Sequence, residues 1–167
     1  MAVLGSKRSI VPRISRWAFD DSMNWKVFRA GLNDVELARQ TIIEVHDRGI
    51  EDEETLRTFL ADPSAYFLIA ESDGKAIGGL EGRALLHPNR CQPQFLLYKI
   101  DVLPEWRRRG VGSALVQKFI DEARRADAYE IWVLTGTSNA AAVALYSKLG
   151  FGQENTDDVM MNLALGA

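Results

Sequence analysis

The stretch DVLPEWRRRGVGSAL, residues 101–115, decides the fold. It runs from the end of an apolar strand pattern, through a Pro-Glu turn, into a basic run and then a helical pattern. Unpaired N–H groups at a helix start carry the positive end of the helix dipole and attract anions. Gly110 and Gly112 remove the Cβ atoms that would keep a phosphate away from the backbone. The arginines at 107–109 add charge-assisted hydrogen bonds to phosphate oxygens.

Two plainer interpretations of this stretch stay open. The arginines can form a solvated basic patch, and the glycines can be simple turn formers. The common nucleotide-binding loops fit less well, because the sequence contains neither Gly-x-x-x-x-Gly-Lys-Ser/Thr nor a full Gly-x-Gly-x-x-Gly. The stretch by itself therefore predicts a phosphate site without naming the ligand.

The composition narrows the class of protein. A chain of 167 residues with 47% hydrophobic residues is long enough for one domain with its own core. A net charge of -3 argues against nucleic acid as a partner and suits a cationic substrate. The sequence has no apolar run of membrane-spanning length and no secretory signal pattern, so we expect no membrane partner. Cys91, the single cysteine, cannot form an internal disulfide, which favours a cytoplasmic location, and it is interpreted as structural. No metal site is predicted.

The chain divides into an arm and a domain. Residues 1–24 show no sustained periodicity and are predicted to form a flexible or loosely docked N-terminal arm. Trp17 and Phe19 can pin this arm to the domain or to a partner subunit, so a homodimer is also predicted. Residues 25–167 form the predicted domain.

Periodicity and turn residues predict an α+β fold with a mixed central sheet. The expected order is a strand, two helices, three antiparallel strands, a helix, a strand, a helix and two strands. The expected strands are residues 25–29, 66–71, 76–86, 95–103, 130–135, 151–154 and 159–163, and the expected helices are 33–47, 51–60, 110–126 and 139–149. Residues 87–93, with a proline near each end, are expected to form a loop that holds Cys91.

The chain resembles the GNAT superfamily of N-acetyltransferases at two motifs. The pyrophosphate motif Arg/Gln-x-x-Gly-x-Gly/Ala is matched at residues 107–112, after a strand that ends in hydrophobic-x-Val at 100–102. The second motif, an Asn followed by Ala-x-x-Leu-Tyr-x-x-x-Gly-Phe, is matched by NAAAVALYSKLGF at residues 139–151. The resemblance extends over residues 25–163. It implies the GNAT fold, a mixed central β-sheet with helices on both faces and a splayed parallel strand pair that binds acyl-CoA.

The resemblance also implies which residues hold acetyl-CoA. Backbone groups of 100–102 would bind the acetyl-pantetheine arm, 107–113 would cradle the pyrophosphate, and Asn139 would bind pantetheine or its phosphate. Tyr146 would stand near the thioester sulfur, although it can instead be a core aromatic. The implied cofactor-binding residues are Ile100, Asp101, Val102, Arg107, Arg108, Arg109, Gly110, Val111, Gly112, Ser113, Asn139, Ala142 and Tyr146.

The expected reaction is direct attack of an amine on acetyl-CoA. A protonated amine must first lose a proton, usually to a carboxylate or an ordered water. Glu81 and Asp101 are equal candidates for this base, and each can instead be a surface charge or an ion-pair partner. Tyr146 can protonate the leaving thiolate, and the Val102 N–H can polarise the thioester carbonyl.

Strand alternation predicts where these side chains point. Lys99 and Asp101 are expected on one face of their strand, and Tyr98, Ile100 and Val102 on the other. The two histidines are given no catalytic role: His46 is expected on a helix surface and His87 in a loop.

A narrower resemblance concerns the acceptor. Residues 132–150 and 157–161 are similar to the small aminoglycoside 3-N-acetyltransferases, which implies antibiotic resistance as the function. Asp157, Asp158 and Glu81 would then bind substrate ammonium groups, although 157–158 can also be a polar turn. Those enzymes have Tyr-Asp where this chain has Tyr98-Lys99, and Asp101 can substitute. The alternatives are an acetyltransferase for another small-molecule or protein amine, and a non-catalytic acyl-CoA-binding module.

Overall fold

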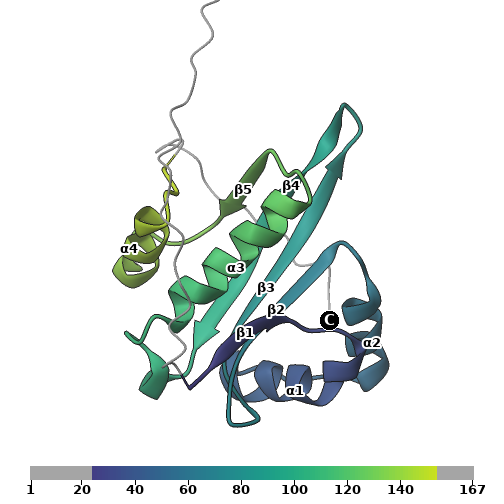
Figure 1. The fold of residues 1–167 in the computed structure, drawn as a ribbon, viewed down its shortest axis with the longest axis vertical. Coiled ribbons are helices and arrows are strands. Elements are labelled where there is room, and N and C mark those ends of the chain that lie inside the picture. Colours follow the sequence, from purple (N-terminus) through teal and green to yellow (C-terminus); the bar gives the residue numbers. More distant parts are fainter. Residues whose placement is uncertain (1–23, 154–167) are drawn as a thin grey trace, which may run out of the picture.

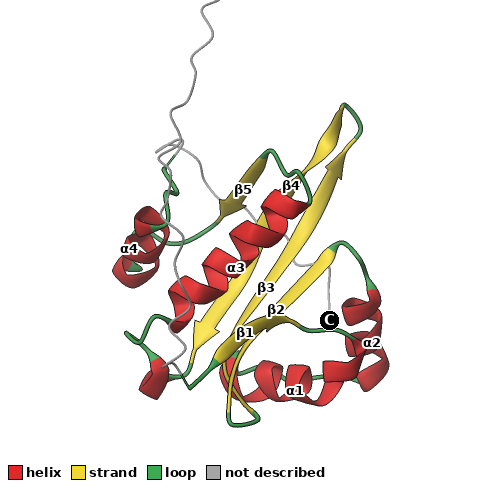
Figure 2. Cartoon of the chain, in the orientation of Figure 1, coloured by secondary structure: helices red, strands yellow, loops and turns green. Residues whose placement is uncertain are grey.

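A five-stranded mixed sheet forms the centre of the computed structural model, which describes residues 24–153 (Figures 1 and 2). The strands lie in the order β1-β2-β3-β4-β5. Neighbours from β1 to β4 are antiparallel, and β5 is parallel to β4. The strands are β1 (Lys26–Arg29), β2 (Ala65–Ser72), β3 (Lys75–His87), β4 (Arg90–Val102) and β5 (Glu130–Val133). The predicted mixed sheet is confirmed.

Helices cover both faces of this sheet (Figure 1). We call the two sides the α1 face and the α3 face. The helical segments are η1 (Leu32–Asp34), α1 (Val35–Gln40), η2 (Thr41–Val45, π-helical), α2 (Glu53–Ala61), η3 (Pro104–Trp106), α3 (Val111–Arg125) and α4 (Ala140–Lys148). Local signals explain their limits: the Asp52 side chain caps α2 by accepting the Thr55 N–H, and Gly150, at φ +93°, follows α4.

Each face of the sheet has its own hydrophobic core. On the α3 face, the apolar stripe of α3 packs on β2 to β4, with Leu115 and Phe119 fully buried. Gly82 makes room for the Phe119 ring, since a Cβ there would overlap with the ring atoms. On the α1 face, Ala38 and Leu56 pack against Phe67 of β2. Burial on both faces makes the central strands rigid supports for the side chains at their ends.

The prediction of a loop at residues 87–93 is wrong. β3 and β4 form a long hairpin whose turn is only Pro88–Asn89, so Cys91 lies exposed on a strand. A strand normally excludes proline because the ring nitrogen has no hydrogen to donate. Pro93 is accommodated because its backbone groups point away from β3: its carbonyl accepts the Tyr129 N–H at 3.1 Å, just before β5 begins, so β3 needs no N–H from this position.

β5 ends at Val133, two residues before the predicted end. The prediction of a strand at 151–154 is wrong over its described part, residues 151–153, because the Phe151 N–H donates to the Tyr146 carbonyl at 3.0 Å and so completes the end of α4. The expected strand at 159–163, with Asp157 and Asp158 before it, lies outside the described residues. The predicted arm, residues 1–24, lies outside them too except for Asn24, and the predicted homodimer stays a prediction. Among the helices of residues 24–153, none is long and apolar enough to cross a membrane.

Candidate active site

β4 and β5 separate halfway along the sheet. Their pairing covers only Gln94–Leu97 with Glu130–Val133, and β4 then continues without β5 to Val102. A β-bulge marks the point of separation, because Glu81 pairs with Lys99 whereas Gly82 pairs with Leu97. The extra residue is Tyr98. A bulge bends its strand and increases the local twist, which accounts for the departure of β4 from β5.

The bulge also changes which side chains share a face. Leu97 and Ile100 both pack in the α3-face core although they are three residues apart. Tyr98 is 57% exposed and is approached from the α1 face, where the Arg48 guanidinium lies 5.9 Å from its ring centroid. The prediction that Tyr98 shares a face with Ile100 and Val102 is therefore wrong, because simple alternation does not hold through a bulge.

The open edge of β4 presents backbone groups to the gap between the strands. The Leu103 N–H donates to the Ile77 carbonyl of β3 at 3.0 Å. Successive residues of a strand point their backbone groups to opposite sides, so those of Ile100 and Val102 point away from β3. The Val102 carbonyl accepts the Arg107 Nε–H at 3.0 Å. The Val102 N–H lies on the same side of the strand and therefore points into the gap, where a carbonyl oxygen can accept it.

The residues after β4 form a helix start that could bind an anion. Gly110 is the N-cap of α3 at φ +86°, a left-handed conformation that glycine adopts at little cost. The first turn of α3 has no acidic residue, and residues 107–109 are exposed arginines. A Cβ on Gly112 would lie 3.6 Å from Leu145 and 3.8 Å from Val102, which are ordinary contacts. Packing does not require glycine at 112, and the missing Cβ leaves the backbone there open to a ligand.

Helix α4 lies beside this helix start. Asn139 caps α4, with its Oδ1 accepting the Ala142 N–H at 3.2 Å, so its amide NH2 remains for a ligand. Tyr146 is 6% exposed, and its ring packs 5.6 Å from that of Phe151. Burial, and then the negative charge of Asp101, raise the pKa of the Tyr146 phenol. Tyr146 therefore stays protonated at neutral pH and can act as an acid.

The α1 face of the sheet carries a paired carboxylate, that of Asp101. Asp101 Oδ2 pairs with His46 Nδ1 at 2.7 Å and with Lys99 Nζ at 2.9 Å. Burial raises the pKa of the Asp101 carboxyl, but the hydrogen bonds from His46 and Lys99 outweigh it, and the pKa lies below its usual value. Lys99 and Asp101 share this face, as the sequence predicts.

The prediction that His46 is a helix-surface residue is wrong. The histidine is only 5% exposed, because the π-helical turn η2 directs it toward the sheet. His87, expected in a loop, ends β3. The sequence offers one signal for the buried position: Gly78-Gly79 in a strand pattern marks a close approach by a neighbouring element.

Glu81 lies on the same face as Asp101. On β3, Gly79 faces His46 and Arg83 pairs with Asp62, so the residue between them points to the α1 face as well. Glu81 is partly buried opposite Lys99. In contrast to Asp101, Glu81 makes no ion pair with another described residue. The two candidates for the base, Glu81 and Asp101, therefore lie on the same face of the sheet but differ in their ion-pair partners.

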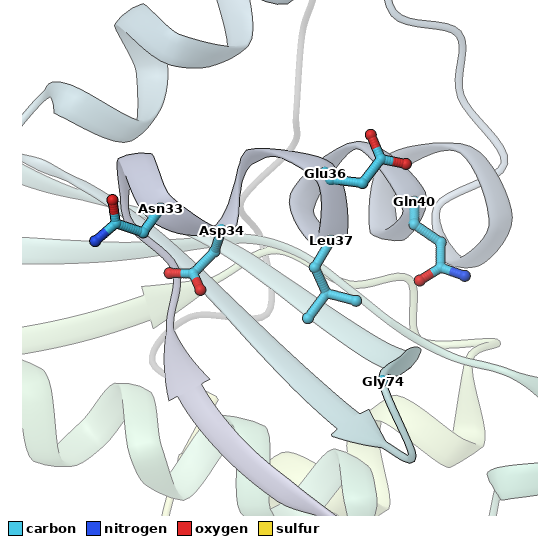
Figure 3. Close-up of a pocket in the computed structure, with 6 residues that line it drawn as sticks. All are labelled: Asn33, Asp34, Glu36, Leu37, Gln40 and Gly74. Atoms are coloured by element: carbon cyan, nitrogen blue, oxygen red, sulfur yellow. The ribbon is translucent and has the colours of Figure 1, made fainter.

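A surface hollow of about 450 Å³ lies away from these residues, between α1 and the β2–β3 turn (Figure 3). Its lining is Asn33, Asp34, Glu36, Leu37, Gln40 and Gly74. Three of its polar side chains already have partners: Asp34 accepts the Gly31 N–H, Glu36 accepts from Arg39, and Gln40 accepts the Ala76 N–H. The hollow is a surface groove separate from the gap between β4 and β5. Within residues 24–153, no cluster of three or more potential metal ligands is found.

A family comparison agrees with this geometry. Residues 33–151 match the acetyltransferase (GNAT) family, which includes both motifs and the whole sheet from β2 to β5. The chain belongs to the GNAT acetyltransferase family, whose members use acetyl-CoA as the acyl donor.

The curated relatives of this chain are N-acetyltransferases. It is 42% identical over 57 residues to the ribosomal protein bS18-alanine N-acetyltransferase of Escherichia coli K12, covering 34% of this chain and 38% of the relative. It is 33% identical over 95 residues to mouse N-acetyltransferase family 8 member 3, covering 57% of this chain and 42% of the relative. The chain thus aligns with well under half the length of these curated relatives.

Solved structures show the same fold. An aminoglycoside acetyltransferase from an uncultured soil metagenomic sample, in complex with sisomicin, superposes with a TM-score of 0.72 at 22% identity, over 84% of this chain and 97% of that one. The ribosomal-protein-alanine N-acetyltransferase of Brucella melitensis biovar Abortus 2308 gives a TM-score of 0.64 at 18% identity, over 83% and 99%. At such identities the likeness establishes the fold alone.

Proposed function

We propose that this protein is an acetyl-CoA-dependent N-acetyltransferase that modifies a primary amine of a polycationic small molecule, in particular the 3-amino group of an aminoglycoside. The observation that carries the proposal is the open edge of β4. There the Val102 N–H faces a gap with an anion-binding helix start on one side and the carboxylates Glu81 and Asp101 on the other. Acetyl-CoA and the acceptor amine could therefore approach each other at the Val102 N–H.

The donor half of the proposal rests on the α3 face. The backbone N–H groups at the start of α3 and the arginines 107–109 would bind the pyrophosphate. Asn139 and the open edge of β4 would hold the pantetheine arm, and acetyl-CoA supplies the acetyl group as a thioester. The Val102 N–H would stabilise negative charge on the carbonyl oxygen, and the Tyr146 phenol would give its proton to the sulfur as the C–S bond breaks.

The acceptor half rests on the α1 face. Asp101 is ionised and has two cationic or N–H partners already, so it is a weak base but a good binding group for an ammonium ion. Glu81 has no such partner among the described residues and is the better proton acceptor, directly or through a water. The amine nitrogen would lose its proton to Glu81, form the new N–C bond and release the thiol.

Two acceptor classes have specific support. An aminoglycoside is supported by the carboxylates on the α1 face and by similarity of residues 132–150 to the small 3-N-acetylating enzymes. Asp157 and Asp158 would add ammonium-binding groups. The second candidate, the N-terminal alanine of a ribosomal protein, is supported by the 42% identity over 57 residues to the bacterial enzyme with that activity.

Turnover separates the two classes. Purified protein is incubated with acetyl-CoA and each member of a panel of aminoglycosides, and with a peptide that begins with alanine and the same peptide blocked at its N-terminus. Thiol release gives the rate, and mass spectrometry and NMR of the product locate the acetyl group. Acetylation at the 3-amino position supports the leading proposal, whereas acetylation of the free peptide alone replaces it with the second. Acetyl-CoA binding without turnover on any amine identifies a non-catalytic binding module.

A further inference from the structure

We propose that His46 is a positioning residue of the acceptor site, which holds the Asp101 carboxylate by Oδ2 and leaves Oδ1 to bind the ammonium group of the acceptor. This inference rests on the proposed acetyl transfer to an amine. It assigns a role to a residue that lies 55 positions from Asp101 in the sequence and outside both motifs.

The His46 ring is buried at a cost in stability. Its side chain is 2% exposed, and Nε2 is buried with no hydrogen-bond partner in the described part of the chain. A buried polar atom without a partner is unfavourable, whereas an apolar side chain of similar size would avoid this penalty. Packing alone therefore does not favour histidine. The ring makes one polar contact, from Nδ1 to Asp101, and an apolar side chain could not make this contact.

Three features of the fold place the ring. The π-helical turn η2 ends immediately before His46, whose backbone N–H donates to the Thr41 carbonyl at 3.0 Å. The Phe67 ring packs edge-on against the imidazole, with 6.0 Å between centroids. Gly79 leaves the space that the ring occupies, since a Cβ there would lie 2.9 Å from Nε2. Gly79 is also the register partner of Asp101, so the ring reaches β4 across an empty position on β3.

The geometry at Asp101 leaves one oxygen for a ligand. Both His46 and Lys99 contact Oδ2, and no interaction of Oδ1 is found among the described residues. Because a carboxylate accepts hydrogen bonds, Nδ1 is the protonated nitrogen of the ring. The imidazole is rigidly held, whereas Lys99 is a long side chain that can move aside for an incoming ammonium group. His46 thus fixes the direction of Oδ1 whether or not Lys99 stays in place.

The test compares three substitutions of His46. His46→Leu removes the N–H donor and keeps an apolar volume. His46→Asn keeps a donor near the position of Nδ1, and His46→Gln, the matched control, carries its amide near the position of Nε2. We expect His46→Leu and His46→Gln to raise KM for the acceptor about tenfold, as for loss of a hydrogen bond to a charged group. We expect the Kd of acetyl-CoA to change less than about twofold, and His46→Asn to recover most of the acceptor KM.

A second arm uses Asp101→Asn as the background. If His46 acts through the carboxylate, His46→Leu has little further effect on acceptor KM in that background. An unchanged acceptor KM in His46→Leu overturns the inference, and so does an equal rise for acetyl-CoA and acceptor. Thermal unfolding of each variant shows whether a rise in acceptor KM comes from misfolding. If His46→Leu misfolds, the acceptor KM of His46→Asn compared with that of His46→Gln tests the inference.

A third measurement separates this inference from the proposed function. ¹⁵N NMR of the imidazole reports which ring nitrogen carries the proton without any need for turnover. A protonated Nδ1 that loses its hydrogen-bond shift in Asp101→Asn supports the pairing, and an unprotonated Nδ1 refutes it. Wild-type protein that turns over no amine refutes the proposed function instead and leaves the pairing to be judged by NMR.

Discussion

Gly79→Ala is expected to lower the free energy of unfolding by about 2 kcal/mol, within the range of about 1–3 kcal/mol for overpacking a core. The new Cβ would lie 2.5 Å from Thr41 Cγ2 and 2.9 Å from His46 Nε2, both closer than real Cβ contacts. Thr41 is fully buried and its hydroxyl donates to the Leu37 carbonyl at 2.7 Å, so it cannot rotate away freely. The strain must be relieved by movement of η2 from the sheet.

Urea unfolding followed by circular dichroism measures this loss. With a slope of about 2 kcal/mol per molar urea, a loss of about 2 kcal/mol lowers the midpoint by about 1 M. The thermal midpoint should fall by about 4–8 °C for a domain of this size. Gly49→Ala is the matched control, because nothing lies within 4 Å of a Cβ at that position, and we expect it to change stability by less than about 0.5 kcal/mol.

A double variant tests whether the named contact is the cause. Thr41→Ser removes Cγ2 and retains the hydroxyl that bonds Leu37. Gly79→Ala combined with Thr41→Ser should therefore be more stable than the sum of the two single losses predicts, with a coupling energy of about 1 kcal/mol. The reasoning is refuted if Gly79→Ala is as stable as Gly49→Ala, or if the two losses simply add.

Three further predictions concern catalysis, pH and the cofactor. Tyr146→Phe should lower kcat by at least about tenfold while the Kd of acetyl-CoA stays unchanged, measured by thiol release and calorimetry; an unchanged kcat removes Tyr146 from the mechanism. Because the pKa of Asp101 is lowered in the fold, its pairing stabilises the protein above the unfolded pKa of about 3.9 and this contribution is lost as the pH falls through the folded value. Urea unfolding between pH 5 and pH 3 should accordingly show a larger loss for wild type than for Asp101→Asn, and equal losses would contradict the pairing. Gly112→Ala should weaken acetyl-CoA binding about tenfold without loss of stability, whereas Gly110→Ala, at φ +86°, should also lower the free energy of unfolding by about 1 kcal/mol. Calorimetry measures the binding and urea unfolding measures the stability. A Gly112→Ala variant that binds acetyl-CoA normally would argue against close approach of the ligand to residue 112.

Much of the architecture could be predicted from the sequence because its signals are local. The apolar stripe of α3, the cap at Asn139 and the glycine at 150 each act within a few residues, and their helices begin and end close to where these signals predict. The predicted strand boundaries were wrong where pairing with another strand determines them. The hairpin turn at Pro88–Asn89 is short because β3 and β4 pair almost to their ends, which the prolines alone do not reveal.

The candidate site also has residues that the sequence could locate and residues whose roles it could not assign. Residues 107–113 and 139–151 are contiguous motifs, so the helix start and Tyr146 can be located from the order of residues alone. The roles of Asp101 and Glu81 could not be separated, because the difference lies in their partners rather than in their own positions. Asp101 is paired twice and Glu81 is not paired with any described residue.

The sequence by itself determined the GNAT family, the order of the elements from β1 to α4 and the stretch expected to bind the acyl donor, since each depends on local patterns and short motifs. Only the tertiary structure decided the bulge at Tyr98, which turns that side chain to the α1 face, and the pairing of His46 with Asp101. Both arise from contacts between elements far apart in the chain. A register shift depends on the partner strand, and the burial of His46 depends on the empty position at Gly79, so neither is encoded by local periodicity.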